Sequence, residues 1–250
     1  MSQLGVENPD VAVFFSGGAS GLRYLIESDP GYGDEYDVVC AFTDNPQATG
    51  AGFVRDKGIP LLHNDIEEFY EERDADIRDL DVRSEFDRET LELIEPNDPD
   101  LIVLSGYMRI LTDPVVEEYP IINVHPADLR KEDEDGERIY TGFDPVYDAV
   151  VAGQPYTRSS THLVTSDVDD GPLIAVSRPF KVHRELVDPL VERDALESVR
   201  DYSDSHQEWM KWQGDGPALA KSLELVSDGR VDLEDGEIEV DGEKGPFVMG

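Results

Sequence analysis

An amide and an imidazole stand at the end of an apolar run in the middle of the chain, in Ile121-Ile-Asn-Val-His-Pro126. Because alternate residues of an extended chain point to the same side, Asn123 and His125 are expected to project together. An amide can donate to a developing oxyanion and an imidazole can move a proton, so the pair suits acyl transfer. A hydrogen-bonded core histidine beside a turn asparagine is the alternative interpretation.

The glycine-rich turn Ser16-Gly-Gly-Ala-Ser-Gly21 is a second candidate site. It follows the apolar residues 11–15 and precedes a predicted helix at 22–28. Backbone N–H groups of such a turn, with the positive end of the helix dipole, can hold a phosphate. The glycine spacing matches neither a dinucleotide fingerprint nor a Walker loop, so a turn without a ligand is the alternative.

An acidic turn, Ser166-Asp-Val-Asp-Asp-Gly-Pro172, is the third candidate. Its carboxylates are too few and too closely spaced for an EF-hand loop, and a solvated turn is the ordinary interpretation. One carboxylate close to His125 would favour imidazolium and raise the pKa of that histidine. We interpret His162, in the strand before the turn, as structural. Three further histidines have no partner at metal-ligand spacing: His63, His183 and His206.

Short apolar runs alternate with helical patterns, and these elements must position the candidate residues. Strands are predicted at 11–15, 36–42, 59–62, 101–105, 121–124, 161–165, 173–176 and 179–182. Further helices are predicted at 48–57, 84–94 and 193–212. The alternation indicates an α/β fold with a mostly parallel sheet, in which ligands bind beyond the carboxyl ends of the strands. An alternating stretch at 229–242 around Asp235-Gly236 predicts a hairpin.

Acidic residues dominate the composition, 57 against 21 basic ones, for a net charge of −36. No basic patch is available to replace phosphate counterions, so neither nucleic acid nor an anionic membrane is expected as a partner. At about 1 M salt the Debye length is only about 3 Å, so the surface charges barely repel one another. We therefore expect a halophilic protein, which works in concentrated salt. The sequence shows neither a signal peptide nor an apolar stretch long enough to span a membrane, which predicts a cytoplasmic protein. The single cysteine, Cys40, is predicted to be a core residue.

Three segments taken together resemble the phosphoribosylglycinamide formyltransferase family. They are Ser105-Gly-Tyr-Met-Arg-Ile-Leu111, Asn123-Val-His-Pro126 and residues 162–172. The corresponding family blocks read close to A-G-F-M-R-I-L, N-I-H-P and H-x-V-T-x-x-x-D-x-G-P. The likeness covers about residues 11–182 and returns weakly at 227–230. It implies a Rossmann-like fold with helices on both faces of the sheet, followed by a C-terminal helix and hairpin.

The resemblance implies one domain over residues 1–250, with the core sheet in 11–182 and a helical segment and hairpin in 183–250. It also implies transfer of a formyl group from 10-formyltetrahydrofolate to the amine of glycinamide ribonucleotide, in purine biosynthesis. The substrates would be small molecules, no metal would be needed, and a homodimer is compatible with the family.

Carried over by position, Asn123 and His125 would be the catalytic pair, and Asp169 the carboxylate acting on the histidine. The residues implied for the folate side are Arg83, Met108, Arg109, Ile110, Leu111, Thr165, Ser166, Asp167 and Val168. Those implied for the ribonucleotide side are Ala19, Ser20, Gly21 and Glu208.

The chain departs from the family on the acceptor side. The family's phosphate loop usually reads S-G-x-G-S-N, whereas here Ala19 replaces the second glycine and Gly21 replaces the asparagine. Backbone donors remain, but the asparagine side chain is lost. The segment after Pro126 is longer and acidic, with Asp144 and Val146 in place of family histidines. Residues 181–227 resemble the corresponding part of the family only poorly.

Two alternatives follow from these departures. The first is that the enzyme formylates another amine, or passes the formyl group to water as a deformylase. Known deformylases carry an N-terminal regulatory domain, and a first strand near residue 11 is expected to leave no room for one. A non-catalytic nucleotide- or folate-binding module is the second alternative, although it would not need an oxyanion donor beside an acid–base pair. A dehydrogenase fits worst, because the glycine spacing is wrong for a dinucleotide.

Overall fold

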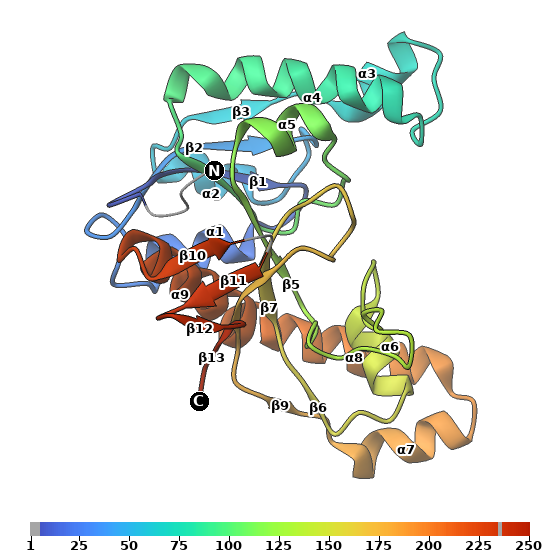
Figure 1. Ribbon diagram of the computed structural model, residues 1–250. Coiled ribbons are helices and arrows are strands. Elements are labelled where there is room, and N and C mark those ends of the chain that lie inside the picture. The colour runs from blue at the N-terminus through green and yellow to red at the C-terminus, as the bar shows by residue number, and fades with distance from the viewer. Residues whose placement is uncertain (1–5, 235–236) are drawn as a thin grey trace.

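The centre of the computed structural model is an eight-stranded sheet in the order β13-β8-β7-β5-β4-β1-β2-β3 (Figure 1). The structure describes residues 6–234 and 237–250. Neighbouring strands run parallel except that β7 is antiparallel to both β5 and β8, so the predicted, mostly parallel α/β fold is confirmed. The strands are β1 (Asp10–Phe15), β2 (Asp37–Thr43), β3 (Leu61–His63), β4 (Leu101–Leu104), β5 (Ile121–His125), β7 (Ser160–Leu163), β8 (Leu173–Val176) and β13 (Phe247–Val248).

Helices cover both faces of the sheet because its central strands are apolar on both sides. In β1, Val13 and Phe15 pack into one buried cluster, and Ala12 and Phe14 into another on the opposite face. The first cluster lies under α1 (Ser20–Glu27), α2 (Ala51–Asp56) and α9 (Gly216–Ser227). The second lies under α3 (Ile66–Glu72), α4 (Leu80–Ile94) and α5 (Asp113–Glu118). Cys40 is fully buried there, as predicted.

Helix α4 begins earlier than the predicted 84–94 because an aspartate caps it. The Asp79 carboxylate accepts hydrogen bonds from the N–H groups of Asp81 and Val82. Such a cap satisfies backbone donors that a helix N-terminus otherwise leaves without partners. Asp65 caps α3 in the same way.

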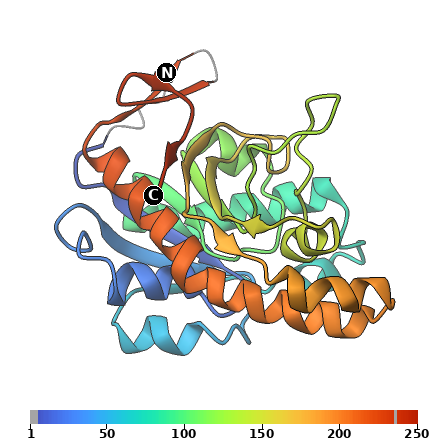
Figure 2. The same cartoon turned by 90° about the horizontal axis from the view of Figure 1, so that it is seen from below.

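Helix α8 (Leu196–Met210) continues through a π-helical turn, η2 (Lys211–Asp215), into α9, and together they cross the molecule (Figure 2). The sequence predicted one helix at 193–212 and no α9. A glycine is needed where α9 crosses α1, since a Cβ on Gly216 would lie 2.3 Å from the Tyr24 ring. The remaining elements are η1 (Glu95–Asn97), α6 (Pro145–Val151), β6 (Tyr156–Thr157), β9 (Phe180–Lys181) and α7 (Arg184–Glu192).

The C-terminal segment forms an antiparallel sheet of β10 (Val231–Glu234), β11 (Glu237–Val240) and β12 (Glu243–Lys244). The predicted turn Asp235-Gly236 lies outside the described residues. The chain then returns to the central sheet, where β13 pairs in parallel with β8. The sequence did not predict this last strand. No helix in the described ranges is long and apolar enough to cross a membrane.

Candidate active site

The fold brings Asn123, His125 and Asp169 together at the end of β5. Asn123 and His125 project from alternate positions of that strand, and Asp169 lies in the loop between β7 and β8 with a left-handed φ of 54°. The Asn123 Nδ2 donates to the Asp169 carboxylate at 3.4 Å. The other oxygen of that carboxylate lies 3.5 Å from His125 Nδ1. An amide, an imidazole and a carboxylate from two separate segments therefore converge.

The imidazole of His125 is held from both sides. Its Nε2 donates to the backbone carbonyl of Tyr140 at 2.8 Å, because a carbonyl oxygen can only accept. Burial lowers the pKa of His125, while the negative charge of Asp169 and the Tyr140 carbonyl oppose that effect. The expected influence of the carboxylate is thus present, but burial outweighs it, and the pKa of His125 lies below its ordinary value.

A second histidine, His162, completes the cluster, and the sequence had offered no role for it beyond structure. Its Nδ1 donates to the Leu163 carbonyl at 2.9 Å, which leaves Nε2 free to accept from Asn123 Nδ2 at 3.1 Å. The same Nε2 lies 3.4 Å from Asp169. His162 faces Asn123 across the β5–β7 pair. It is the first residue of the third family block, but its contact with Asn123 depends on the strand register, which local sequence does not reveal.

The carboxylate of Asp169 is stabilised in its ionised form. Burial alone would raise its pKa, but the nearby side chains of His162 and His125 and the N–H of Gly142 lower it to about 2. The Gly142 N–H donates to Asp169 at 3.1 Å, and the Arg138 guanidinium donates to the Asp169 carbonyl. Both donors come from the longer acidic segment after Pro126, which therefore covers the carboxylate.

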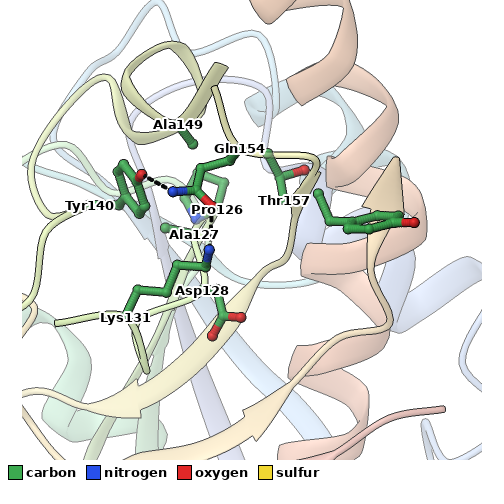
Figure 3. A pocket seen from close by; sticks show the side chains of 9 residues that line it. Pro126, Ala127, Asp128, Lys131, Tyr140, Ala149, Gln154 and Thr157 are labelled. Atoms are coloured by element: carbon green, nitrogen blue, oxygen red, sulfur yellow. Dashed lines mark hydrogen bonds between the residues drawn. The ribbon is translucent and has the colours of Figure 1, made fainter. Parts of the chain in front are cut away.

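A small cavity is lined by Tyr140, the residue whose carbonyl accepts from His125, together with Pro126, Gln154 and their neighbours (Figure 3). Its volume is about 10 Å³, roughly the room of one water molecule, so it is no substrate pocket. Within it, Gln154 donates to the Tyr140 hydroxyl at 2.7 Å and accepts from the Lys131 ammonium. These bonds fix Tyr140 and, through its carbonyl, the orientation of the His125 ring.

Two buried carboxylates anchor the loop at 105–112 that was assigned to the folate side. Asp44, whose side chain is fully buried, accepts from Arg109 Nε at 2.8 Å. Asp87, equally buried, accepts from both the N–H and the hydroxyl of Thr112 at 2.7 Å. The loop is therefore held near its middle by Asp44, the residue after β2, and at its end by Asp87 of α4.

Beneath this loop lies a cluster of buried charges. Arg83 is only 4% exposed and Tyr107 8%. Five side-chain atoms in this part of the molecule are buried without a protein partner among the described residues: Asp44 Oδ1, Asn64 Nδ2, Arg83 Nη1, Asp87 Oδ1 and Tyr107 OH. Buried polar groups are rarely left unpaired, so water molecules or ligand atoms are expected to complete their hydrogen bonds.

The other residues assigned to the folate side lie in the loop at 105–112 and in the turn before Asp169. Met108, Ile110 and Val168 are half-exposed apolar side chains, and Leu111 is buried. Thr165, Ser166 and Asp167 are exposed in the turn that leads to Asp169. Exposed apolar side chains beside a polar cluster are typical of a ligand site.

The glycine-rich turn has the form of an anion-binding loop. Ala19 adopts a left-handed conformation (φ 52°, ψ 45°) immediately before α1. The N–H groups of residues 18–21 make no hydrogen bond within the described part of the chain. Successive free N–H groups of this kind, at a helix N-terminus, attract phosphate. Asn45 supports the turn by donating to the Ser16 carbonyl at 3.1 Å.

Glu208 lies apart from these loops, on the exposed side of α8, where it pairs with Lys211. It makes no contact with the turn at 16–21 in the part of the chain that the structure describes. Over the same residues, no cluster of histidine, cysteine and carboxylate side chains could hold a metal ion.

Comparison with known proteins supports this arrangement. The model of the formyl transferase family matches residues 10–195. The chain is 29% identical over 167 residues to phosphoribosylglycinamide formyltransferase of Escherichia coli (strain K12), covering 66% of this chain and 70% of that protein. It is 35% identical over 124 residues to formyltetrahydrofolate deformylase of Bacillus subtilis (strain 168), covering 46% of this chain and 39% of that protein.

The fold is shared with the structure of a phosphoribosylglycinamide formyltransferase from Coxiella burnetii. The TM-score is 0.72 at 24% identity, with 98% of this chain and 100% of that chain covered. The matched family segment contains the amide, the imidazole, the carboxylate and the glycine-rich turn described above. The chain therefore belongs to the formyl transferase family.

Proposed function

We propose that the protein transfers the formyl group of 10-formyltetrahydrofolate to the amine of glycinamide ribonucleotide. The convergence of Asn123, His125 and Asp169 carries the proposal. The names of the E. coli and Coxiella burnetii relatives support this choice of acceptor. A soluble, cytoplasmic enzyme of purine biosynthesis is part of the same proposal, and a homodimer stays a prediction.

In the reaction the substrate amine attacks the formyl carbon, so no covalent enzyme intermediate is needed. Asn123 donates to the formyl oxygen as negative charge builds on it. The imidazolium form of His125, favoured by ionised Asp169, assists the same oxygen and donates its proton to the folate nitrogen as the formyl carbon leaves that nitrogen. The neutral imidazole then takes up the proton that the substrate amine loses. The new carbon–nitrogen bond to the acceptor then replaces the one to tetrahydrofolate.

Three segments would supply the binding groups for this reaction. The loop at 105–112 and the turn at 165–168 would hold the folate beside Asp169, with Arg83 beneath the first of them. The free N–H groups of residues 18–21 would hold the ribonucleotide phosphate.

The direct test is to mix the pure protein with 10-formyltetrahydrofolate, with and without glycinamide ribonucleotide. We expect tetrahydrofolate to form only when the amine is present. Formate released without any amine would instead favour the deformylase alternative, which the local 35% identity to the Bacillus subtilis enzyme supports. Folate binding without turnover on either acceptor would indicate a binding module.

Replacing Asp169 with asparagine should shift the pH dependence of turnover. The charge of Asp169 raises the pKa of His125 against the effect of burial, so its removal lowers that pKa further. The imidazolium is the assisting form. In the unchanged protein, kcat should fall as the pH rises through the His125 pKa. In Asp169→Asn this fall should come at a lower pH, and kcat at neutral pH should be roughly 10²-fold smaller than in the unchanged protein. Complete pH profiles of kcat for both proteins measure this.

Asp170→Asn is the matched control, because Asp170 is the adjacent carboxylate and is exposed. Its pH profile should coincide with that of the unchanged protein. An Asp169→Asn profile that also coincides would remove the proposed link between the carboxylate and the imidazole.

The protein's stability should depend strongly on salt, as part of the proposed halophilic character. Carboxylates crowd one another: burial and the neighbouring Asp100 and Asp37 raise the pKa of Asp10. Lowering KCl from about 1 M to about 0.01 M extends the Debye length from about 3 Å to about 30 Å. The repulsion within a net charge of −36 then acts over the whole molecule. We expect the urea midpoint of unfolding to fall on this transfer, and an unchanged midpoint would contradict the proposal.

A further inference from the structure

The phosphate loop (residues 16–21) and the folate loop (residues 105–112) exchange hydrogen bonds through one serine each. Ser105 of the folate loop accepts from the Leu22 N–H of α1 at 3.1 Å. Ser16 of the phosphate loop accepts from the Met108 N–H at 3.0 Å and donates its own N–H to the Gly106 carbonyl at 3.1 Å. Ser16 therefore holds backbone groups of the folate loop, and Ser105 holds the start of α1, the helix that follows the phosphate loop.

The serine at 105 and the glycine at 21, both departures from the family blocks, meet in this contact. A Cβ added to Gly21 would lie 2.7 Å from the Ser105 hydroxyl oxygen and 2.8 Å from Leu219 Cδ1. The family has alanine and asparagine at these two positions. The Ser105 hydroxyl thus fills space that a side chain at 21 would need, and it binds one of the N–H groups at the start of α1.

We propose that Ser16 and Ser105 are positioning residues that couple the two substrate sites, so that phosphate bound in the first loop strengthens folate binding in the second. The inference rests on the proposed function, since it takes from there the ligand of each loop. Neither hydroxyl is required to touch a substrate.

The physical basis is the cost of ordering a loop. A phosphate that binds the N–H groups of residues 18–21 fixes the turn and the start of α1. Because Ser16 and Ser105 bind across the interface, the backbone from Gly106 to Met108 is fixed at the same time. Folate then binds a loop that is already ordered and loses less conformational entropy. By linkage, folate must strengthen phosphate binding by the same factor.

The test measures the dissociation constant of tetrahydrofolate by calorimetry, with and without saturating ribose 5-phosphate as the probe of the phosphate loop. We expect ribose 5-phosphate to tighten folate binding about fivefold or more in the unchanged protein. In Ser16→Ala and Ser105→Ala the ratio of the dissociation constants without and with ribose 5-phosphate should fall to about one. Ser16→Thr, which keeps the hydroxyl, should keep the ratio of the unchanged protein. Equal affinities with and without ribose 5-phosphate in the unchanged protein, or full coupling in Ser16→Ala, would overturn the inference.

Ser203→Ala is the matched control: its hydroxyl is buried and donates to the Val199 carbonyl within α8. It should keep the full coupling. Ser16→Ala is the safer of the two coupling variants, because Met108 is half-exposed and water can reach its N–H, whereas Ser105→Ala leaves a buried N–H without a partner.

Hydrogen exchange separates failure of this inference from failure of the proposed function. Ribose 5-phosphate alone should slow amide exchange at 106–112 in the unchanged protein and in Ser203→Ala, but not in Ser16→Ala. This readout needs no folate. Protection without any folate binding would reject the proposed function but keep the link between the two loops. Folate turnover without protection would keep the proposed function and reject the link.

Discussion

Replacing Asn123 with alanine should lower kcat by about 10²–10³-fold, the usual cost of losing an oxyanion donor. The Asn123 amide is half-buried and bonded to His162 at 3.1 Å, which holds it beside His125 before any substrate binds. Its loss removes a preorganised donor that acts when charge develops on the formyl oxygen. Steady-state kinetics with both substrates saturating would measure the effect, and circular dichroism would verify the fold.

His125→Ala should cause a loss of similar size, and the double variant should be little worse than either single one. Groups that act on one oxyanion as a unit are strongly non-additive when removed. The control is Asn97→Ala, since the Asn97 side chain in η1 donates to the nearby carbonyl of Ile94, the last residue of α4. Near-normal kcat in Asn123→Ala or His125→Ala would end the catalytic assignment, and a large loss in Asn97→Ala would assign the effects to folding instead.

The second large effect is expected on stability, from Gly171→Ala in the turn that carries Asp169. A Cβ at position 171 would lie 1.8 Å from the backbone carbonyl oxygen of Leu163. No side-chain rotation can relieve a contact between backbone and Cβ, so β7 and the turn must separate. We expect the free energy of unfolding to fall by roughly 3 kcal/mol, the upper range for overpacking.

This change should also impair catalysis, because Asp169 is only two residues away and moves with the turn. Urea unfolding followed by fluorescence gives the stability, and kcat of the folded fraction gives the activity. Gly52→Ala is the control: Gly52 lies in α2, where a Cβ would meet nothing within 4 Å. That substitution should stabilise by up to about 1 kcal/mol through helix propensity. Equal stability of the two variants would contradict the packing argument.

The juxtaposition of Asn123 and His125 could be predicted from sequence because strand geometry dictates it. The two-residue spacing of Asn123 and His125 on an apolar strand places both side chains on one side, and the observed β5 agrees. The central strands were predictable for the same reason, since continuous apolar runs indicate strands buried on both faces. Asp169 required the family resemblance, because nothing local distinguishes it from its two acidic neighbours.

The contacts that complete the site depend on tertiary structure and were not predictable. His162 reaches Asn123 through the antiparallel register of β5 and β7, and Tyr140 reaches His125 from a loop with no regular pattern. Helix α9 was missed because it follows a π-helical turn and begins with Gly216 and a proline. These features depend on packing between distant segments rather than on local propensity.

Strand β13 has a consequence for how the protein is made. Residues 247–248 are synthesised after the other seven strands of the central sheet, yet they pair with β8. Until they leave the ribosome, the outer edge of β8 has unpaired N–H and C=O groups, which invite pairing with other nascent chains. A premature stop before position 247 should therefore yield chains that aggregate, even though every residue of the reaction centre has been translated.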